Sequence, residues 1–347
     1  MIMQTEHQSI IQINTPAAFK VECPLTYKIA QNIDHIREMA KEIILGKDKR
    51  LLVVVGPCSI HDINSALEYA SHLQQVSERL SDDLCIVMRT YFEKPRTTLG
   101  WRGFLSDPHL DGSHDINLGL KLARKLLLHI NDLGLGTATE FLDTIIPHYL
   151  ADLISWVAMG ARTSESQIHR EVASGLPMPV GFKNNTYGNV QPAIDAVNVA
   201  RHPHCTLGIS QEGFPALFKT TGNSICHITL RGSHTHPNFH SQAVENAAHL
   251  LRLSHLNPAM MIDCSHGNTG KNYQLQQQVI QSVCEQIANG SNYIFGVMIE
   301  SHLVAGKQKF IPHQPLTYGQ SITDACLSWE DTIPLLEKLA FTNSRRR

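Results

Sequence analysis

The chain has 347 residues, of which 42% are hydrophobic and 17% are charged, and its formal net charge is −2. This composition supports a large hydrophobic core and argues against a disordered chain, while the charge excludes a generally basic protein that coats nucleic acid. The eight cysteines include no CxxC pair, and no signal peptide or membrane-spanning apolar run is apparent. We therefore expect a cytoplasmic protein with reduced thiols that binds neither nucleic acid nor membranes.

Residues 1–45 precede the first predicted strand and form an N-terminal extension to a barrel domain that covers residues 46–347. Within the extension, residues 33–45 have a helical pattern, which Gly46 ends. The extension carries no catalytic set of residues. Added elements of this kind commonly serve regulation or subunit contacts, and we expect such a role here.

Eight short apolar runs follow, and each ends at a polar, metal-binding or cationic residue. The runs, each with the residue after its end, are 52–56 with Cys58, 84–88 with Arg89, 135–139 with Glu140, 156–160 with Arg162, 179–182 with Lys183, 226–230 with Arg231, 260–264 with His266 and 293–299 with Glu300. Most are rich in Val, Ile and Leu without clean alternation, as strands buried on both faces are. Helical periods separate most of them, at 63–79, 118–133, 145–153 and 274–288. Eight strand–helix units predict a (β/α)8 TIM barrel, whose reactive groups lie at the carboxyl ends of its strands.

A second addition interrupts the barrel before its sixth strand. Two strand-like segments, 204–210 and 216–220, flank the turn Gln211-Glu212-Gly213. This pattern predicts a β-hairpin inserted at about residues 204–223. It carries no catalytic set either, so a role in regulation or subunit contacts is again expected.

The predicted strand ends gather positive charge at one mouth of the barrel. Six cationic side chains should converge there, namely Arg89, Lys94, Arg96, Arg162, Lys183 and Arg231. So many cations with few carboxylates are unstable unless anions fill the site, and arginine and lysine suit carboxylate and phosphate groups. Each residue taken alone could instead be an ordinary surface partner in an ion pair. Their concentration at strand ends favours a site for two anionic substrates.

Metal-binding residue types occur at neighbouring strands. Cys58, His266 and Glu300 follow the first, seventh and eighth strands, and Asp324 lies beyond the eighth. A thiolate, an imidazole and two carboxylates suit a divalent transition metal such as Mn, Fe, Co or Zn. The residues alone leave an alternative of equal weight, in which Cys58 packs as a small hydrophobic residue and His266 is a hydrogen-bonded core histidine.

A series of longer motifs occurs in order along the chain. They are Gly56-Pro57-Cys58-Ser59-Ile60-His61-Asp62, Met88-Arg89-Thr90-Tyr91-Phe92-Glu93-Lys94-Pro95-Arg96-Thr97-Thr98, Gly160-Ala161-Arg162-Thr163, Gly181-Phe182-Lys183-Asn184, Leu230-Arg231-Gly232, Asp263-Cys264-Ser265-His266-Gly267-Asn268, Ile299-Glu300-Ser301 and Ser321-Ile322-Thr323-Asp324-Ala325-Cys326. Together they resemble the microbial type I 3-deoxy-D-arabino-heptulosonate 7-phosphate (DAHP) synthases. The resemblance covers nearly the whole chain from about residue 25, and the Lys-Pro-Arg-Thr-Thr block is its most specific part.

The resemblance implies condensation of phosphoenolpyruvate with erythrose 4-phosphate to DAHP and phosphate, at the entrance to aromatic amino-acid biosynthesis. It implies that phosphoenolpyruvate is held by Arg89, Lys94, Arg162, Lys183 and Arg231. The second substrate would face Lys94, Pro95, Arg96 and Thr97. The metal would be held by Cys58, His266, Glu300 and Asp324 and would polarise the aldehyde of the sugar phosphate.

Two further roles in catalysis follow from the same resemblance. Lys94, between the two substrates, could donate a proton to the forming alkoxide if neighbouring cations depress its pKa. Glu140 is the candidate for orienting the water that adds to phosphoenolpyruvate. Cys58 and His266 count as catalytic because they hold the metal.

Regulation is implied as well, because the family builds an allosteric pocket for an aromatic amino acid from its N-terminal extension and hairpin. The matching positions are Pro147, His148, Pro177, Thr206 and Gly208. Relatives carry glycine or serine at the position of Gly208, and a glycine would leave room for a phenolic hydroxyl, which favours tyrosine over phenylalanine as inhibitor. Pro177 replaces the usual serine, which could reshape or abolish the pocket. The resemblance also implies a homodimer or homotetramer.

The chain departs from the family pattern in two loops. Asn185 and Tyr187 stand where the family usually has glycine and aspartate, and the loop after Arg231 is longer and poorer in glycine and lysine. These departures lie beside the matched functional residues and bear on loop conformation, not on the reaction. Independently of them, two alternatives accompany the main interpretation. A related octulosonate phosphate synthase would not need the Lys-Pro-Arg-Thr-Thr block, and an inactive anion-sensing barrel would not need all four metal-type residues.

Overall fold

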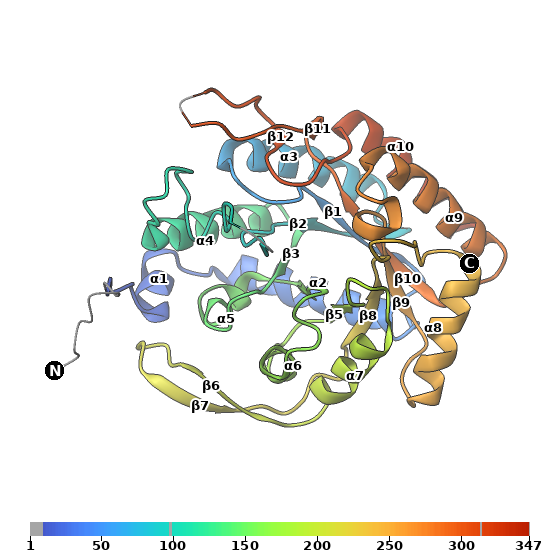
Figure 1. Ribbon diagram of the computed structural model, residues 1–347, viewed down its shortest axis with the longest axis horizontal. Helices are drawn as coiled ribbons and strands as arrows, with labels where there is room; N and C mark the ends of the chain where they lie inside the picture. The colour runs from blue at the N-terminus through green and yellow to red at the C-terminus, as the bar shows by residue number, and fades with distance from the viewer. Residues whose placement is uncertain (1–9, 97–98, 313, 347) are drawn as a thin grey trace.

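The structure is a computed structural model that describes residues 10–96, 99–312 and 314–346. Eight parallel strands close into a barrel in the order β1, β10, β9, β8, β5, β4, β3 and β2 (Figure 1). Their bounds are β1 Leu51–Gly56, β2 Leu84–Arg89, β3 Gly136–Glu140, β4 Trp156–Met159, β5 Val180–Lys183, β8 His227–Leu230, β9 Met260–Asp263 and β10 Ile294–Glu300. The predicted (β/α)8 barrel is confirmed.

The first strand shows why these runs lack clean hydrophobic alternation. Leu51, Val53 and Val55 pack in the outer layer against the helices, whereas Leu52 and Val54 belong to the cluster that fills the barrel. Every residue of this strand is buried. Both faces of a barrel strand therefore need apolar side chains, which gives a continuous run of them.

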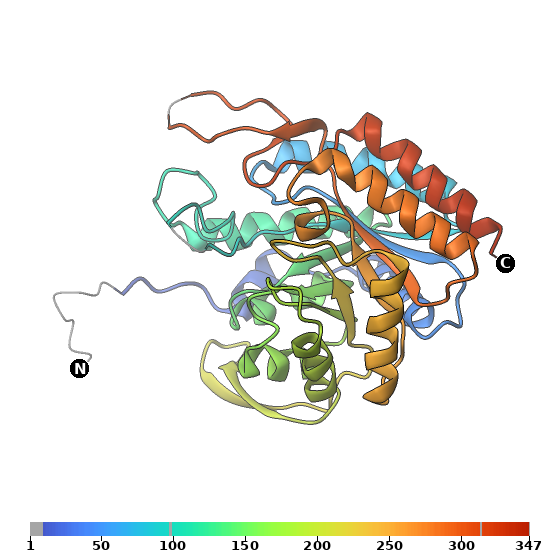
Figure 2. The same cartoon turned by 45° about the vertical axis from the view of Figure 1, so that its right-hand side comes forward.

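Helices cover the outside of the barrel (Figure 2). They are α3 Ile63–Arg79, α4 Ile116–Asp132, α5 Ile146–Leu150 with a 3-10 turn at Ala151–Leu153, α6 Gln167–Ser174, α7 Gln191–Ala200, α8 Ser241–Leu253, α9 Gln276–Ala288 and α10 Trp329–Ser344. Side-chain caps set the start of three of them, because Asp62 accepts from the backbone N of Asn64 and Ser65, Asp115 from that of Leu118, and Ser328 from that of Asp331. Among the described helices, none has both the length and the apolarity to cross a membrane.

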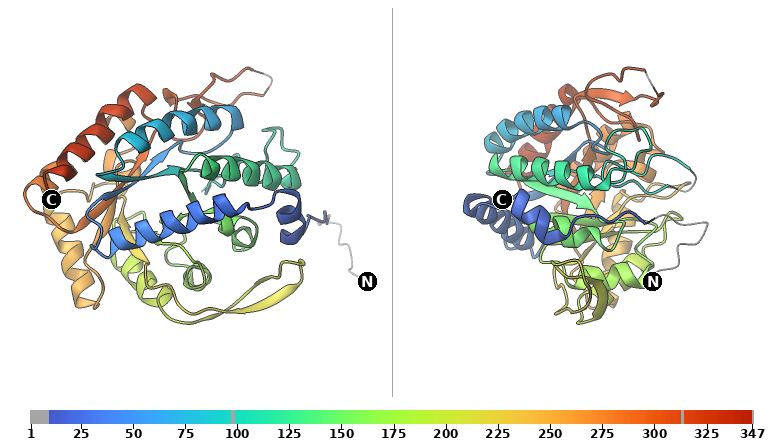
Figure 3. Two further views of the ribbon diagram at one scale, coloured as in Figure 1. Left: turned by 180° about the vertical axis from the view of Figure 1, so that it is seen from behind. Right: turned by 90° about the vertical axis from the view of Figure 1, so that its left-hand side faces the viewer.

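The N-terminal extension contributes two helices, α1 Pro16–Glu22 and α2 Tyr27–Ile44. The predicted helix at 33–45 is the second half of α2, which runs between α4 and the inserted hairpin when seen from behind (Figure 3, left). Ile36, Ala40 and Ile43 join the buried cluster inside the barrel, and Ile36 lies against Gly136 at the start of β3. This helix therefore closes the amino end of the barrel, opposite the strand ends that carry the candidate site.

The predicted hairpin is present as β6 Cys205–Ile209 and β7 Pro215–Lys219, paired antiparallel. Its turn contacts α1, since the backbone N of Ala17 donates to the carbonyl of Gln211 over 2.9 Å. β5 pairs directly with β8, so the hairpin leaves the barrel ladder uninterrupted. A smaller sheet of β11 Val304–Lys307 and β12 Gln320–Ser321 lies after β10.

Candidate active site

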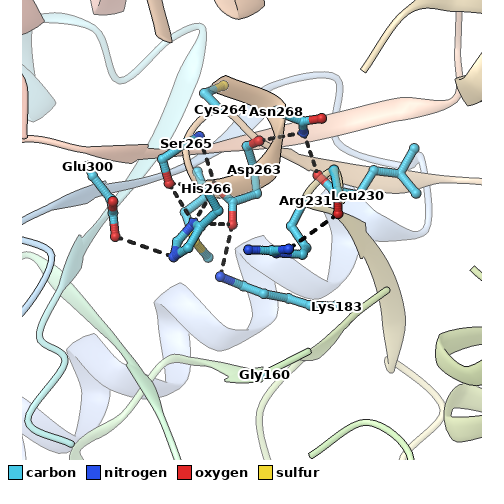
Figure 4. A network of polar contacts seen from close by, with 12 residues as sticks. Gly160, Lys183, Leu230, Arg231, Asp263, Cys264, Ser265, His266, Asn268 and Glu300 are labelled. Carbon is cyan, nitrogen blue, oxygen red and sulfur yellow. Dashed lines mark hydrogen bonds and ion pairs between the residues drawn. The ribbon is translucent and has the colours of Figure 1, made fainter. Parts of the chain in front are cut away.

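The carboxyl ends of the strands bring a dense polar network together at one end of the barrel (Figure 4). Asp263 at the end of β9 is its centre and is fully buried. Its Oδ2 lies 2.9 Å from Nζ of Lys183 and 2.9 Å from Nδ1 of His266. Its Oδ1 accepts hydrogen bonds from the backbone N and the hydroxyl of Ser265, over 3.0 and 2.8 Å. One carboxylate thus joins a cationic side chain at the end of β5 to the histidine that follows β9.

The charge state of this network follows from its contacts. Burial alone would raise the pKa of Asp263, but His266 and Lys183 hold it well below its usual range. Because Nδ1 of His266 faces a carboxylate that only accepts, the proton lies on Nδ1. The other ring nitrogen, Nε2, then points toward Glu300, whose Oε1 is 3.6 Å away.

Arg89 at the end of β2 is fully buried and holds Glu300 in place. Its Nη2 lies 3.1 Å from Oε1 of Glu300, and its Nε donates to the carbonyl of Pro57 over 3.2 Å. The guanidinium also stacks over Tyr91, 3.7 Å from the ring centroid. Burial would raise the pKa of Glu300, but His266 and Arg89 lower it, so the group is a carboxylate. Arg89 thus supports a candidate metal ligand besides its expected role with substrate.

Lys94 lies against Cys58 after β1. Its Nζ is 3.1 Å from Sγ of Cys58 and 3.2 Å from the carbonyl oxygen of the same residue. Burial would lower the pKa of Lys94, but Cys58 and Glu300 raise it above its ordinary value. The expected depression of this pKa by neighbouring cations is therefore wrong for this arrangement, because the nearby sulfur and carboxylate outweigh those cations. Lys94 carries its proton.

The remaining residues that the sequence predicts to bind anions lie around the same mouth. Arg231 is buried, and among the described residues no carboxylate lies within ion-pair distance of it; its Nη1 makes one long contact, 3.4 Å, with the carbonyl of Gly232. Burial lowers the pKa of Arg231, the negative charge of Asp263 opposes this shift, and Arg162 adds repulsion. Arg96 is exposed on the loop after β2 and donates from Nε to the carbonyl of Trp101 over 2.8 Å. Pro95 lies beside it on that loop, and Thr97 falls outside the described residues.

The four expected metal ligands approach one another from separate segments. His266, Glu300 and Asp324 line a cavity of about 10 Å³, and Glu300 and Asp324 both raise the pKa of the Cys58 thiol by their charge, after burial. The loop of Asp324 is joined to that of Cys58 by a 2.7 Å hydrogen bond between Ser59 and Thr323. The imidazole of His266 and the carboxylates of Glu300 and Asp324 line this cavity, and with the sulfur of Cys58 they supply a donor set that fits a single divalent transition ion.

These side chains are engaged with cations rather than arranged around a shared centre. Lys94 contacts Cys58, Arg89 contacts Glu300, and Nζ of Lys271 lies 3.4 Å from Oδ1 of Asp324. In the described part of the chain no three His, Cys, Asp or Glu side chains stand at metal-binding geometry. Ligation would require side-chain rotations that bring the four donor groups around one point.

Glu140 at the end of β3 is buried at the mouth. A Cβ built on Gly160 would lie only 2.1 Å from Oε1 of Glu140. Residue 160 must therefore be glycine for this carboxylate to keep its position. The sequence motif contains this glycine, but its contact becomes visible only in the structure.

Sequence reasoning missed two groups of residues in the site. Asp263 precedes His266 by three residues, a spacing that could have suggested a supporting carboxylate. Three asparagines also tie the strand ends together: Asn184 accepts from the backbone N of Arg231 over 2.8 Å and from Asn238, and Asn268 accepts from the backbone N of Asn238. Buried amides in loop motifs are the signal that could have found them.

A separate cavity of about 370 Å³ lies between α5, α6 and the hairpin, away from the strand ends. Its lining includes four of the expected regulatory residues, Pro147, His148, Pro177 and Thr206. Gly208 lies behind them, because a Cβ there would be 2.4 Å from Nε2 of His148. The His148 ring packs on Phe218 with centroids 4.7 Å apart. The room expected above Gly208 is thus filled by His148.

Comparisons with known proteins place this geometry in context. The model of the DAHP synthetase I family matches residues 25–337. The Phe-sensitive phospho-2-dehydro-3-deoxyheptonate aldolase of Escherichia coli (strain K12) is 52% identical over 340 residues, which cover 98% of this chain and 97% of that protein. The Trp-sensitive enzyme of the same strain is 51% identical, over 94% of this chain and 93% of that protein. The solved structure of phospho-2-dehydro-3-deoxyheptonate aldolase from Francisella tularensis SCHU S4 matches with a TM-score of 0.96 and 48% identity, and covers 99% of this chain and 100% of that one.

Proposed function

The chain belongs to the DAHP synthetase I family, and from this premise we propose that it condenses phosphoenolpyruvate with erythrose 4-phosphate to DAHP and phosphate, using a divalent metal ion. It is an enzyme of the aldol-condensing transferase type, as the names of its relatives indicate. The observation that carries the substrate proposal is Arg231, a buried guanidinium with no carboxylate partner among the described residues. A buried cation left in this state is stable when an anion completes the site.

Phosphoenolpyruvate fits the inner part of this mouth. Lys183 and Arg231 project from neighbouring strands, β5 and β8, and Arg162 lies close enough to Arg231 to affect its pKa. These groups supply an ammonium and guanidinium forks for the phosphate and the carboxylate. Lys94 stands on the opposite side, on the loop that also carries Pro95 and Arg96, and this loop would hold the sugar phosphate.

The proposed metal would be held by Cys58, His266, Glu300 and Asp324. When bound, a divalent ion supplies Lewis acidity that polarises the aldehyde oxygen of erythrose 4-phosphate. Asp263 keeps the proton of His266 on Nδ1 and leaves Nε2 available as a ligand. Arg89 keeps Glu300 ionised and oriented.

The side chains around the reacting atoms would donate a proton, orient water and hold phosphate. The enol carbon of phosphoenolpyruvate forms a bond to the aldehyde carbon, and the protonated Nζ of Lys94 can give its proton to the alkoxide that forms. Water then adds to the carbon that bears the phosphate, oriented by Glu140, and the C–O bond to phosphate breaks to leave the ketone. Lys183 and Arg231 hold the departing phosphate.

We also propose that the cavity beside the hairpin binds an aromatic amino acid as feedback inhibitor. Its support is the lining of Pro147, Pro177 and Thr206 together with the names of two relatives, which are Phe-sensitive and Trp-sensitive. Because His148 fills the space above Gly208, a tyrosine hydroxyl can enter that space only when the imidazole moves. His148 would therefore decide which aromatic ring is accepted.

A homodimer or homotetramer is the proposed assembly, in the cytoplasm. One face of the hairpin covers the cavity, while Leu207, Phe214 and Leu217 on it are exposed by 78%, 69% and 60%. Exposed apolar side chains of this kind are suited to contact with a second subunit. Sedimentation velocity of the wild type and of a Leu207→Lys, Leu217→Lys variant tests this assignment, which fails if the wild type sediments as a monomer.

The decisive experiment measures phosphate released from phosphoenolpyruvate. We expect release only when erythrose 4-phosphate is added, loss of release with a chelator, and recovery with Mn²⁺. Release with arabinose 5-phosphate in place of erythrose 4-phosphate would instead indicate an octulosonate phosphate synthase. No release with either sugar would contradict the proposed activity.

A further inference from the structure

The carboxylate of Asp263 has one oxygen shared between two functional side chains. Oδ2 lies 2.9 Å from Nζ of Lys183 and 2.9 Å from Nδ1 of His266 (Figure 4). The other oxygen, Oδ1, accepts from the backbone N and the hydroxyl of Ser265 and lies 3.2 Å from Nδ1 of His266. The residue is fully buried, so water cannot replace a lost partner. A change in the contact of Oδ2 with Lys183 should therefore change the strength of its contact with His266, and the reverse.

The two partners belong to different parts of the proposed reaction. Lys183 would contact the anionic groups of phosphoenolpyruvate, and His266 would offer Nε2 to the metal. A histidine becomes a better metal ligand when the carboxylate at its other nitrogen accepts more strongly. When the ammonium group of Lys183 binds a substrate anion, its hydrogen bond to Oδ2 of Asp263 weakens. Oδ2 can then accept more strongly from the Nδ1–H of His266.

We propose that Asp263 is a positioning residue that couples the anion site at Lys183 to the metal site at His266, so that occupation of the first tightens the second. This inference rests on the proposed function. Asp263 touches neither substrate nor metal and acts through its two neighbours. The serine contacts fix the carboxylate plane, because Ser265 holds Oδ1 and its hydroxyl also lies 2.6 Å from Nδ1 of His266.

Mn²⁺ binding to the metal-free full-length enzyme tests the coupling without relying on turnover. Free Mn²⁺ is measured by its electron paramagnetic resonance signal, and the dissociation constant is compared for the wild type, Lys183→Met and Arg231→Met. Both variants remove one buried cation from the same mouth, but only Lys183 bonds to Asp263. We expect Lys183→Met to tighten Mn²⁺ at least about threefold more than Arg231→Met, since the control carries only the through-space effect of the lost charge.

The same comparison in an Asp263→Asn background completes the cycle. Asp263→Asn should weaken Mn²⁺ binding about 10- to 100-fold, and there Lys183→Met should have no effect beyond that of Arg231→Met. Equal effects of the two cation variants in the wild-type background would overturn the coupling, even if Asp263→Asn fails to fold. The coupling would also be overturned if Lys183→Met still tightened Mn²⁺ binding more than Arg231→Met in a folded Asp263→Asn protein.

The outcome separates this inference from the proposed function. An enzyme that binds Mn²⁺ and releases phosphate from phosphoenolpyruvate and erythrose 4-phosphate, yet responds equally to both cation variants, lacks the coupling but keeps the function. An enzyme that binds no Mn²⁺ contradicts both the metal assignment and the coupling.

Discussion

The sulfur of Cys58 lies 3.1 Å from Nζ of Lys94, so a proposed metal ligand and a proposed proton donor are in direct contact. A thiol that ligates a metal ion loses its proton. In the absence of metal, the lysine is the cation nearest to this sulfur. A metal ion bound at Cys58 would therefore compete with Lys94 for the negative charge of this sulfur.

Removal of this sulfur should cost activity through loss of the metal. For Cys58→Ala we expect turnover to fall at least about 100-fold and Mn²⁺ binding to weaken by a similar factor, because one of the four proposed metal ligands is lost. Steady-state phosphate release and the Mn²⁺ resonance signal measure the two effects. Cys284→Ala, at a buried cysteine on α9, is the matched control and should keep both values. Near wild-type turnover of Cys58→Ala in metal-depleted buffer would contradict the ligand assignment.

Oxidation of the metal-free enzyme should join Cys58 to Cys326. Both thiols are buried, and burial followed by the charge of Cys58 raises the pKa of Cys326. Hydrogen peroxide should convert the two thiols to one disulfide and two waters, faster as the pH rises because only thiolates react. Bound Mn²⁺ should protect them. Peptide mapping by mass spectrometry reports the pairing; a Cys58 thiol that stays free throughout peroxide inactivation would rule it out.

Buried His227 on β8 should make the fold sensitive to moderate acid. Burial lowers its pKa to about 4, whereas in the unfolded chain a histidine titrates at about 6.5. The folded state keeps this imidazole neutral down to about pH 4, whereas the unfolded chain binds a proton there below about pH 6.5. The free energy of unfolding is therefore undiminished above pH 6.5 and decreases as the pH falls toward 4. The expected loss is about 3 kcal/mol across that window.

Urea unfolding between pH 7.5 and 4.5 measures this loss. His227→Gln should reduce the pH dependence over the window by about 3 kcal/mol and leave the part that comes from buried His302 and His61, whose pKa values burial also lowers. The matched change at exposed His249, His249→Gln, should leave the pH dependence as in the wild type. An unchanged slope in His227→Gln would assign the acid sensitivity to other groups.

A methyl group at residue 160 should damage catalysis through Glu140. The Cβ of Gly160→Ala would lie 2.1 Å from Oε1 of Glu140 and must displace it. If Glu140 orients the attacking water, kcat should fall about 100-fold with KM for phosphoenolpyruvate little changed. In a Glu140→Ala background the clash is absent, so Gly160→Ala should add no further loss. Additive losses in the double variant would show that residue 160 acts by another route.

The side chain at residue 208 should control inhibition through His148. Gly208→Ser places its Cβ 2.4 Å from Nε2 of His148, which pushes the imidazole toward the cavity. We expect the concentrations of tyrosine and phenylalanine needed for half-inhibition to rise, with tyrosine affected more because its hydroxyl needs the space above residue 208. Inhibition titrations with three aromatic amino acids measure this. His148→Ala should relieve the effect in the double variant, and strong inhibition by phenylalanine with none by tyrosine in the unchanged enzyme would contradict the tyrosine preference.

Sequence reasoning located the barrel because each strand must be apolar on both faces and ends at a functional residue. The positions of Lys183, Arg231 and His266 at one mouth follow directly from that architecture. The sharing of Asp263 between Lys183 and His266 does not follow from the architecture. It depends on the rotamers of these two side chains, which are 80 and 3 residues away from Asp263 in sequence. The same holds for Lys94, whose raised pKa reflects which neighbour is closest rather than how many cations surround it. Helix α2 was predicted as a helix, but its place at the amino end of the barrel depends on the contact of Ile36 with Gly136, which no local pattern encodes.

The direct pairing of β5 with β8 has an evolutionary consequence. Lys183 ends β5 and Arg231 follows β8, and the hairpin between them in sequence does not enter the ladder that pairs these two strands. Substitutions or length changes in residues 204–223 can therefore reshape the cavity beside the hairpin or its exposed face, while the spacing of Lys183 and Arg231 stays the same. Under the roles proposed above, inhibitor choice and catalysis can change independently, and duplicated copies of such a gene can acquire different inhibitors with the same reaction.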